Sequence, residues 1–150
     1  MRVFETVADY VAEKGNEIGV SDWVTIDQER VNLFADATGD HQWIHIDPER
    51  TQKELGMGTI AHGYLTLSLL PHLMGQISGV KSATRGINYG SNQVRFTNMV
   101  PVGSRVRCRV KLKDAAPKAG GTQVINEVTM EIEGQERPAM IAETISLIFE

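Results

Sequence analysis

The first third of the chain spaces its apolar side chains three or four residues apart, which is the period of a helix that buries one face. This pattern predicts a short helix over residues 6–14 and a second helix that follows Asp27 and ends at Gly39. An Asp-Pro pair predicts a third helix from Pro48 to about residue 56, because proline loses no hydrogen bond at the first helical position. The segment "DWVTI" after the first helix is typical of a short strand.

The segment "HGYLTLSLLPHLMGQIS", residues 62–78, differs from these helices because it is apolar nearly all round. A helix of this composition belongs in the interior of a protein. Pro71 lies within it and is expected to bend it, since proline removes one backbone hydrogen bond. We therefore predict a long central helix that the rest of the chain encloses.

After residue 84 the apolar period becomes two, which is the period of a strand with one buried face. Four segments are predicted strands: "TRGINYGSNQVRF", "SRVRCRVKLK", "TQVINEVTMEIE" and "AMIAETISLIF". The last is apolar on both faces, as a central strand is. The turn-rich connections "DAAPKAGG" and "EGQERP" favour an antiparallel meander. The whole pattern predicts an α+β fold in which a curved antiparallel sheet wraps around the central helix.

Length, charge and cysteine content narrow the class of protein. A chain of 150 residues is predicted to form a single domain, 1–150. Its net charge of −4 gives no basic signature for nucleic acid. No apolar run approaches the roughly 20 residues that cross a bilayer, and the acidic amino terminus is not typical of a secretory signal. Cys108 is the only cysteine, which excludes an intramolecular disulfide and favours a reducing cytoplasm.

The strand over residues 105–113 carries a stripe of five basic side chains. Such a stripe could bind an anion, for example the phosphates of a nucleotide-like group. The favoured interpretation is that it faces Glu127, Glu131 and Glu133 across a hairpin, where opposite charges attract. Cys108 lies on the apolar side of the same strand and is interpreted as a small buried hydrophobe rather than a nucleophile.

Two histidines invite a metal-site interpretation, because His41 and His45 have the spacing of two zinc ligands on a helix. However, Gly39 precedes them and Pro48 follows, so the stretch has little reason to be helical. The glutamate of a zinc-protease motif is also absent. We therefore predict no metal at this position.

The stretch "GDHQWIH" places Asp40 five residues before His45. An aspartate and a histidine held near one another can orient a water molecule and transfer its proton. The stretch "TIAHGYLTLSLL" brings His62 and Gly63 to the start of the central helix, where the first amides lack helical partners. The Gly63 amide can donate to a carbonyl oxygen that becomes negative during a reaction. These groups are the minimum needed to add water next to a thioester.

The stretch "FADATGDHQWIHIDPE", followed about fifteen residues later by "IAHGYLTLSLL", resembles the MaoC-like dehydratases and the (R)-specific enoyl-CoA hydratases. The later stretches "INYGSNQVRF" and "VPVGSRV" extend the resemblance to the NodN-related single-domain proteins of this family. The resemblance implies a hot-dog fold, in which a curved antiparallel sheet surrounds a long central helix. It also implies a homodimer.

The resemblance further assigns roles to individual residues. The family's catalytic aspartate and histidine correspond to Asp40 and His45, and its oxyanion-binding amide corresponds to Gly63. The hydratase signature commonly has Asn-Pro between the two catalytic residues, where this chain has Gln42 and Trp43, and the bulky indole is expected to reshape the acyl pocket. The residues expected to bind substrate lie on the central helix, the strand after it and this stretch: Ile60, His62, Tyr64, Trp43, Asn88, Tyr89 and Asn92.

The function implied by the resemblance is reversible hydration of a trans-2-enoyl-CoA to the (R)-3-hydroxyacyl-CoA. No separate cofactor and no metal are expected, because coenzyme A enters as part of the acyl-CoA substrate. Two alternatives remain at this point: an acyl-CoA thioesterase on the same fold, and a non-catalytic acyl-CoA-binding subunit. The sequence also leaves open which of Asp40 and His45 is the base.

Overall fold

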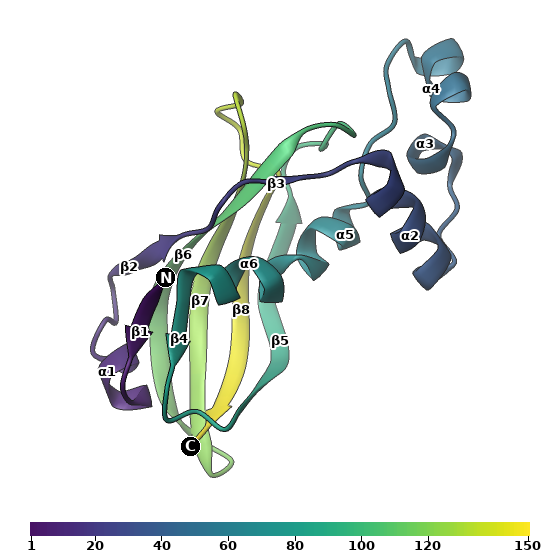
Figure 1. The fold of residues 1–150 in the computed structure, drawn as a ribbon. Coiled ribbons are helices and arrows are strands. Elements are labelled where there is room, and N and C mark those ends of the chain that lie inside the picture. The colour runs from purple at the N-terminus through teal and green to yellow at the C-terminus, as the bar shows by residue number, and fades with distance from the viewer.

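The computed structural model describes all 150 residues, and its main feature is a six-stranded antiparallel sheet (Figure 1). Five strands follow the order β2-β6-β7-β8-β5, and β3 pairs with β6 beside β2. Their bounds are β2 Glu17–Val20, β3 Val24–Thr25, β5 Arg85–Phe96, β6 Arg105–Lys118, β7 Gly121–Ile132 and β8 Met140–Phe149. The predicted meander is confirmed for β6, β7 and β8. Strand β8 pairs on both sides, with β7 and β5, as its two apolar faces indicated.

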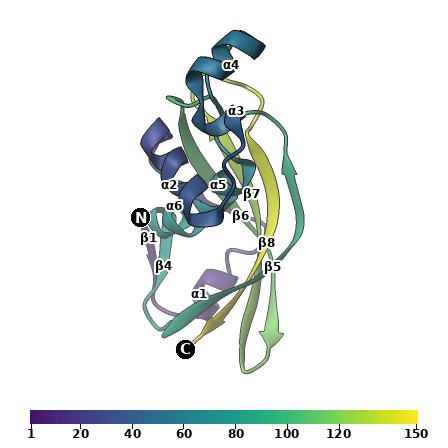
Figure 2. The ribbon, with the colours of Figure 1, turned by 90° about the vertical axis from the view of Figure 1, so that its right-hand side faces the viewer.

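The predicted central helix is present as two consecutive helices, α5 (Gly63–Ser68) and α6 (Leu70–Ile77), which lie across one face of the sheet (Figures 1 and 2). The chain breaks at Leu69, because Pro71 has no amide hydrogen to continue the helical ladder. The helix packs against the inner face of the sheet as predicted, but it is divided in two rather than continuous. Its other face is open to solvent at four side chains: Tyr64, Ser68, Pro71 and His72.

The core lies between these helices and the inner face of the sheet. On β6 the side chains of Val106, Cys108, Val110 and Leu112 are all buried, and Leu73 of α6 packs in the same cluster. The opposite face of the sheet carries ion pairs between basic side chains of β6 and nearby glutamates. The charged face, as it is called below, comprises Arg105, Arg107, Arg109, Lys111, Lys113, Glu17, Glu127, Glu131, Glu133 and Glu143. The interpretation of the basic stripe as a paired surface is therefore confirmed.

Three helices form a separate group beyond one end of the sheet (Figure 1): α2 (Gln28–Thr38), α3 (Trp43–Ile46) and α4 (Pro48–Leu55). The predicted start and end of α2 are confirmed, since the Asp27 carboxylate accepts a hydrogen bond from the Arg30 amide at 2.8 Å and Gly39 adopts a left-handed conformation with φ of 78°. The start of α4 at Pro48 is confirmed too. The four-residue helix α3 was not expected, and it carries His45.

The remaining elements are short, and the sequence pattern predicted them least well. Helix α1 (Val7–Val11) is shorter than the predicted 6–14. Strands β1 (Arg2–Phe4) and β4 (Ser78–Val80) pair in parallel as a separate small sheet, which the pattern did not indicate. The predicted turn "DAAPKAGG" is mostly strand, and the hairpin reverses only at Ala119 and Gly120, both with positive φ. None of the helices is both long and apolar enough to cross a membrane.

Candidate active site

His45 is a buried histidine whose ring is fixed by one backbone contact. Its Nδ1 lies 2.7 Å from the carbonyl oxygen of Ile60, and its residue exposure is 7%. A carbonyl oxygen only accepts hydrogen bonds, so Nδ1 carries the hydrogen. In the neutral imidazole the other nitrogen, Nε2, therefore presents a lone pair. This tautomer makes His45 a proton acceptor at Nε2.

The surroundings of His45 also favour its neutral form. Burial lowers the pKa of His45 below its ordinary value, the hydrogen bond to the Ile60 carbonyl opposes that shift, and the neighbouring His62 ring lowers the pKa further. The Asp40 carboxylate raises the pKa of His45 by a smaller amount. The net shift is downward, so His45 is neutral at pH 7 and available as a base.

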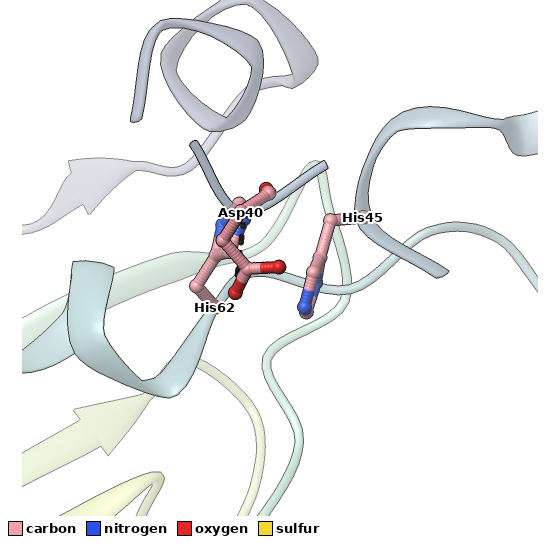
Figure 3. A group of neighbouring side chains, drawn as sticks. All are labelled: Asp40, His45 and His62. Atoms are coloured by element: carbon pink, nitrogen blue, oxygen red, sulfur yellow. Dashed lines mark hydrogen bonds and ion pairs between the residues drawn. The ribbon is translucent and has the colours of Figure 1, made fainter. Parts of the chain in front are cut away.

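Asp40 lies in the loop between α2 and α3, and its side chain is half exposed. Its backbone amide and carboxylate make only long hydrogen bonds within the loop, of 3.4 Å each, to Thr38 Oγ1 and from the Gln42 amide. One oxygen of Asp40 and one ring nitrogen each of His45 and His62 lie within 4.8 Å of one another (Figure 3). A water molecule that bonds to two acceptors spans up to about 5.6 Å, so the Asp40–His45 pair has the spacing of a water-binding site.

His62 is almost completely buried, with 2% exposure, and it immediately precedes α5. Its Nε2 lies 3.0 Å from the backbone carbonyl oxygen of Asp40, and its Nδ1 is buried without a hydrogen-bond partner. Its ring stacks on the ring of His45, with centroids 3.9 Å apart and planes inclined by 25°. The three labelled side chains thus converge from a loop, a short helix and a helix start (Figure 3).

Gly63 begins α5, and its amide donates no hydrogen bond within the protein. A Cβ atom at this position would lie 2.9 Å from the ring of Phe96, so only glycine fits without a shift. Because α5 is six residues long, the case for Gly63 rests on its free amide rather than on a helix dipole. The amide is available to a carbonyl oxygen that reaches the adjoining cavity.

A cavity of about 430 Å³ adjoins His45 and Gly63, and its walls also include Ile60 and the buried Thr66, whereas Asp40 and His62 are not among its lining residues. The sequence predicted the first three of these residues. It missed the residues that close the cavity from the strand ends and loops: Phe96, Thr97, Asn98, Met99, Val100, Arg137 and Ala139. No local pattern marks them, because they meet only when the ends of β5 and β8 come together.

Several residues expected to bind substrate lie away from this cavity. The Trp43 ring lies under the Arg50 guanidinium, 4.3 Å from its centroid, and does not line the cavity. Tyr64 is 68% exposed on the open face of α5. The three residues expected on β5 also lie outside the cavity. The ring of Tyr89 lies beneath the Lys118 ammonium, Asn88 lines a different cavity, and the Asn92 side-chain amide donates a hydrogen bond to Glu143.

The other sites considered from the sequence have structural roles. His41 pairs with Asp36 at 2.9 Å and does not join His45, and the hydrogen bond to Asp36 raises the pKa of His41. Asp40, His45 and His62 have donor atoms within 4.8 Å of one another, close enough to hold a metal ion, but one ring nitrogen of each histidine already bonds to a backbone carbonyl oxygen. Cys108 is fully buried, and burial raises its pKa to about 12, so its thiol is not nucleophilic.

Comparison with known proteins places the chain among a set of relatives. The family model of the MaoC like domain matches residues 9–135. The chain is 55% identical over 146 residues to 3-hydroxyacyl-thioester dehydratase Z of Mycobacterium tuberculosis, and the match covers 97% of each protein. It is 46% identical over 148 residues to nodulation protein N of Rhizobium leguminosarum bv. viciae, covering 95% of this chain and 91% of that protein. These matches confirm the resemblance that the sequence motifs carry.

A solved structure shows the same fold. The unliganded R-hydratase PhaJ1 from Pseudomonas aeruginosa superimposes with a TM-score of 0.72 over 92% of this chain and 83% of that one. Sequence identity in this comparison is 21%, so the likeness concerns the fold. The hot-dog architecture expected from the motifs is thereby confirmed, with the central helix divided in two.

Proposed function

The chain belongs to the MaoC-like domain family, and we propose that it is an enzyme that adds water reversibly to a trans-2-enoyl-CoA, giving the (R)-3-hydroxyacyl-CoA. The observation that carries the proposal is the tautomer of His45, whose bare Nε2 belongs to a buried, neutral ring beside the Asp40 carboxylate and the cavity. The names of the relatives, a 3-hydroxyacyl-thioester dehydratase and an R-hydratase, support the same reaction and the (R) configuration.

The thioester carbonyl is proposed to accept a hydrogen bond from the Gly63 amide. That bond polarises the conjugated double bond and makes C3 more electrophilic. It strengthens as negative charge develops on the carbonyl oxygen, which is where a fixed donor stabilises the transition state most. The walls beyond Gly63, including Ile60 and Thr66, would receive the acyl group.

Water is proposed to bind between Asp40 and His45. As the water oxygen bonds to C3, Nε2 of His45 takes one of its protons, and the electron pair of the double bond moves through C2 to the thioester oxygen. The imidazolium then returns the same proton to C2, which restores neutral His45. Asp40 orients the water and stabilises the transient imidazolium, so the net change is one hydroxyl on C3 and one hydrogen on C2. Because water addition is redox-neutral, the proposed step needs no electron carrier.

The functional unit is proposed to be a homodimer. Strand β5 is an edge of the main sheet, and its side chains are exposed along almost its whole length, including Ile87 at 46% and Tyr89 at 53%. An exposed edge with apolar side chains favours pairing with another chain. A monomer-sized species by light scattering at micromolar concentration, with full activity, would contradict the dimer.

One assay tests the proposed reaction against its rivals. The protein is incubated with crotonyl-CoA while enoyl absorbance and free thiol are followed together. Loss of absorbance without thiol is the expected result. Release of thiol would instead identify a thioesterase on the same fold. If neither absorbance nor free thiol changes with crotonyl-CoA or longer enoyl-CoAs, the result would favour a protein that binds acyl-CoA without catalysis.

A further inference from the structure

The His62 ring contacts both of the residues proposed to hold the water. Its Nε2–H donates to the Asp40 carbonyl at 3.0 Å, and its ring stacks on the His45 ring with centroids 3.9 Å apart. It is not itself among the residues that line the cavity. His62 therefore touches both proposed catalytic residues from behind, without facing the place where substrate binds.

The chemistry of the buried ring argues against a role in filling space alone. Since Nε2 donates to the Asp40 carbonyl, Nδ1 of His62 is left as a buried ring nitrogen without a hydrogen-bond partner. An unpaired buried polar atom is unfavourable, and an apolar ring of the same shape would avoid it. What the imidazole adds at this position is the one hydrogen bond to Asp40.

That hydrogen bond is the shortest one that Asp40 makes. The amide of Asp40 and its Oδ1 are held only by the 3.4 Å contacts within the loop. The carboxylate is half exposed, and its Oδ2 lies 4.0 Å from the His62 Nε2. Neighbouring residues of the loop are held by their own short bonds, such as His41 to Asp36 at 2.9 Å, but at Asp40 itself the His62 ring supplies the only short hydrogen bond.

We propose that His62 is a positioning residue. It holds the Asp40 carboxylate and the His45 ring in the relative positions that bind the water. The proposal rests on the proposed hydratase function and adds to it a third residue that acts through the other two. Misplacement of a reacting group by about 1 Å can cost about 100-fold in rate, so loss of the anchor acts on the chemical step.

Two variants separate the anchor from the ring. His62→Phe keeps a flat ring against His45 but has no donor for the Asp40 carbonyl. His62→Gln places a donor near the position of Nε2 but has no ring. We expect kcat for crotonyl-CoA hydration to fall about 100-fold in His62→Phe with KM within about threefold of wild type. We expect His62→Gln to recover kcat to within about tenfold of wild type.

Phe34→Leu is the matched control, because Phe34 is the other ring beside His62, with centroids 5.0 Å apart, and lies outside the cavity. Loss of packing around His62 without loss of the anchor should lower the melting temperature and leave kcat unchanged. If Phe34→Leu lowers kcat as much as His62→Phe, or if His62→Gln is no better than His62→Phe, the positioning role is overturned.

A measurement without substrate separates this proposal from the proposed function. Imidazole ¹⁵N NMR of the wild-type protein should show His62 as the Nε2–H tautomer with its hydrogen protected from exchange. In His62→Phe the amide and carbonyl signals of Asp40 should broaden or shift, whereas in His62→Gln they should stay near their wild-type positions. An inactive wild-type protein with these NMR results would contradict the hydratase but support the anchor. An unprotected Nε2–H would overturn the anchor whatever the activity.

Discussion

The charged face of the sheet and the corner around Asp40 and His45 use the same kinds of side chain in opposite ways. On the charged face each basic side chain of β6 has a carboxylate within 4.0 Å, and Glu131 alone contacts both Arg107 and Arg109. At the corner two polar groups that adjoin the cavity are left without partners. Nε2 of His45 and the Gly63 amide bond to nothing in the protein, although both belong to residues of the cavity wall.

The difference shows how polar groups that serve only the structure can be distinguished from groups available for catalysis in this protein. Paired charges on a solvated sheet contribute little to stability, and water satisfies whatever hydrogen-bonding capacity the pairs leave. Unpaired donors and acceptors beside a cavity are unfavourable in the empty protein, and their capacity is available to a ligand. On this basis activity should depend on the corner, and the charged face should tolerate change.

The largest expected effect comes from removing the free nitrogen of the corner. His45→Gln should reduce kcat for enoyl-CoA hydration by about 10²- to 10⁴-fold, with a smaller change in KM, because a general base acts in the transition state. His41→Gln is the matched control, since His41 pairs with Asp36 on the surface. Steady-state kinetics on variants verified as folded measures both. Similar losses of kcat in the two variants would contradict the assignment of His45, rather than His41, as the general base.

The next largest effect should come from displacing the free amide. In Gly63→Ala the new Cβ meets the Phe96 ring at 2.9 Å, so either the ring or the start of α5 must move. We expect kcat to fall by about tenfold or more, approaching the loss typical of a missing oxyanion donor. Gly75→Ala is the control, because a Cβ there meets no atom within 4 Å. Unchanged hydration by Gly63→Ala would remove Gly63 from the oxyanion site.

A third test follows the charge state of His45 with pH. The pKa of His45 in the folded protein lies below the ordinary 6.5. The value of kcat/KM should therefore fall about tenfold per pH unit only when the pH is below this lowered pKa. Between the two pKa values the unfolded chain binds more protons than the folded one. Stability therefore rises with pH in that window, and the contribution of His45 is lost as pH falls below 6.5. An acid limb centred above pH 6.5 would contradict a buried neutral His45.

The smallest effect should come from the charged face. Glu131→Gln removes the carboxylate shared by Arg107 and Arg109, and the pairs are partly exposed. We expect a loss of about 1 kcal/mol or less in the free energy of unfolding, which is a few degrees in melting temperature. Hydration kinetics should stay within about twofold of wild type. A loss of activity that exceeds the loss of stability would give the charged face a functional role.

The sheet could be read from the sequence because its signals are local. Strict alternation on β6 and β7 fixes which side chains are buried, and the caps at Asp27 and Gly39 fix the limits of α2. Strands β1 and β4 could not be predicted, because three residues carry no period and their partner is distant in sequence. The composition of residues 62–78 indicated a buried helix, but it could not show which of its side chains the sheet leaves exposed.

The site could be predicted only in part, because some of its residues are marked by local sequence signals and others come together only through tertiary contacts. The spacing of Asp40 and His45 marked the two residues, and the helix start marked Gly63. The ring of His62 was assigned to the substrate because nothing in "IAHGYL" shows that it stacks on His45. The cavity walls at Phe96 and the following loop come from tertiary contact alone.

The central claim is that Asp40 and His45 act as one unit on a single water molecule. The most direct measurement is a double-mutant cycle in kcat for crotonyl-CoA hydration, comparing Asp40→Asn, His45→Gln and the double variant with wild type. Residues that act as a unit are non-additive, so the double variant should be little worse than the worse single one. Additive losses would mean that the two residues act independently. Near-normal hydration by either single variant, verified as folded and of the same oligomeric state as wild type, would contradict the assignment of "GDHQWIH" as the catalytic stretch.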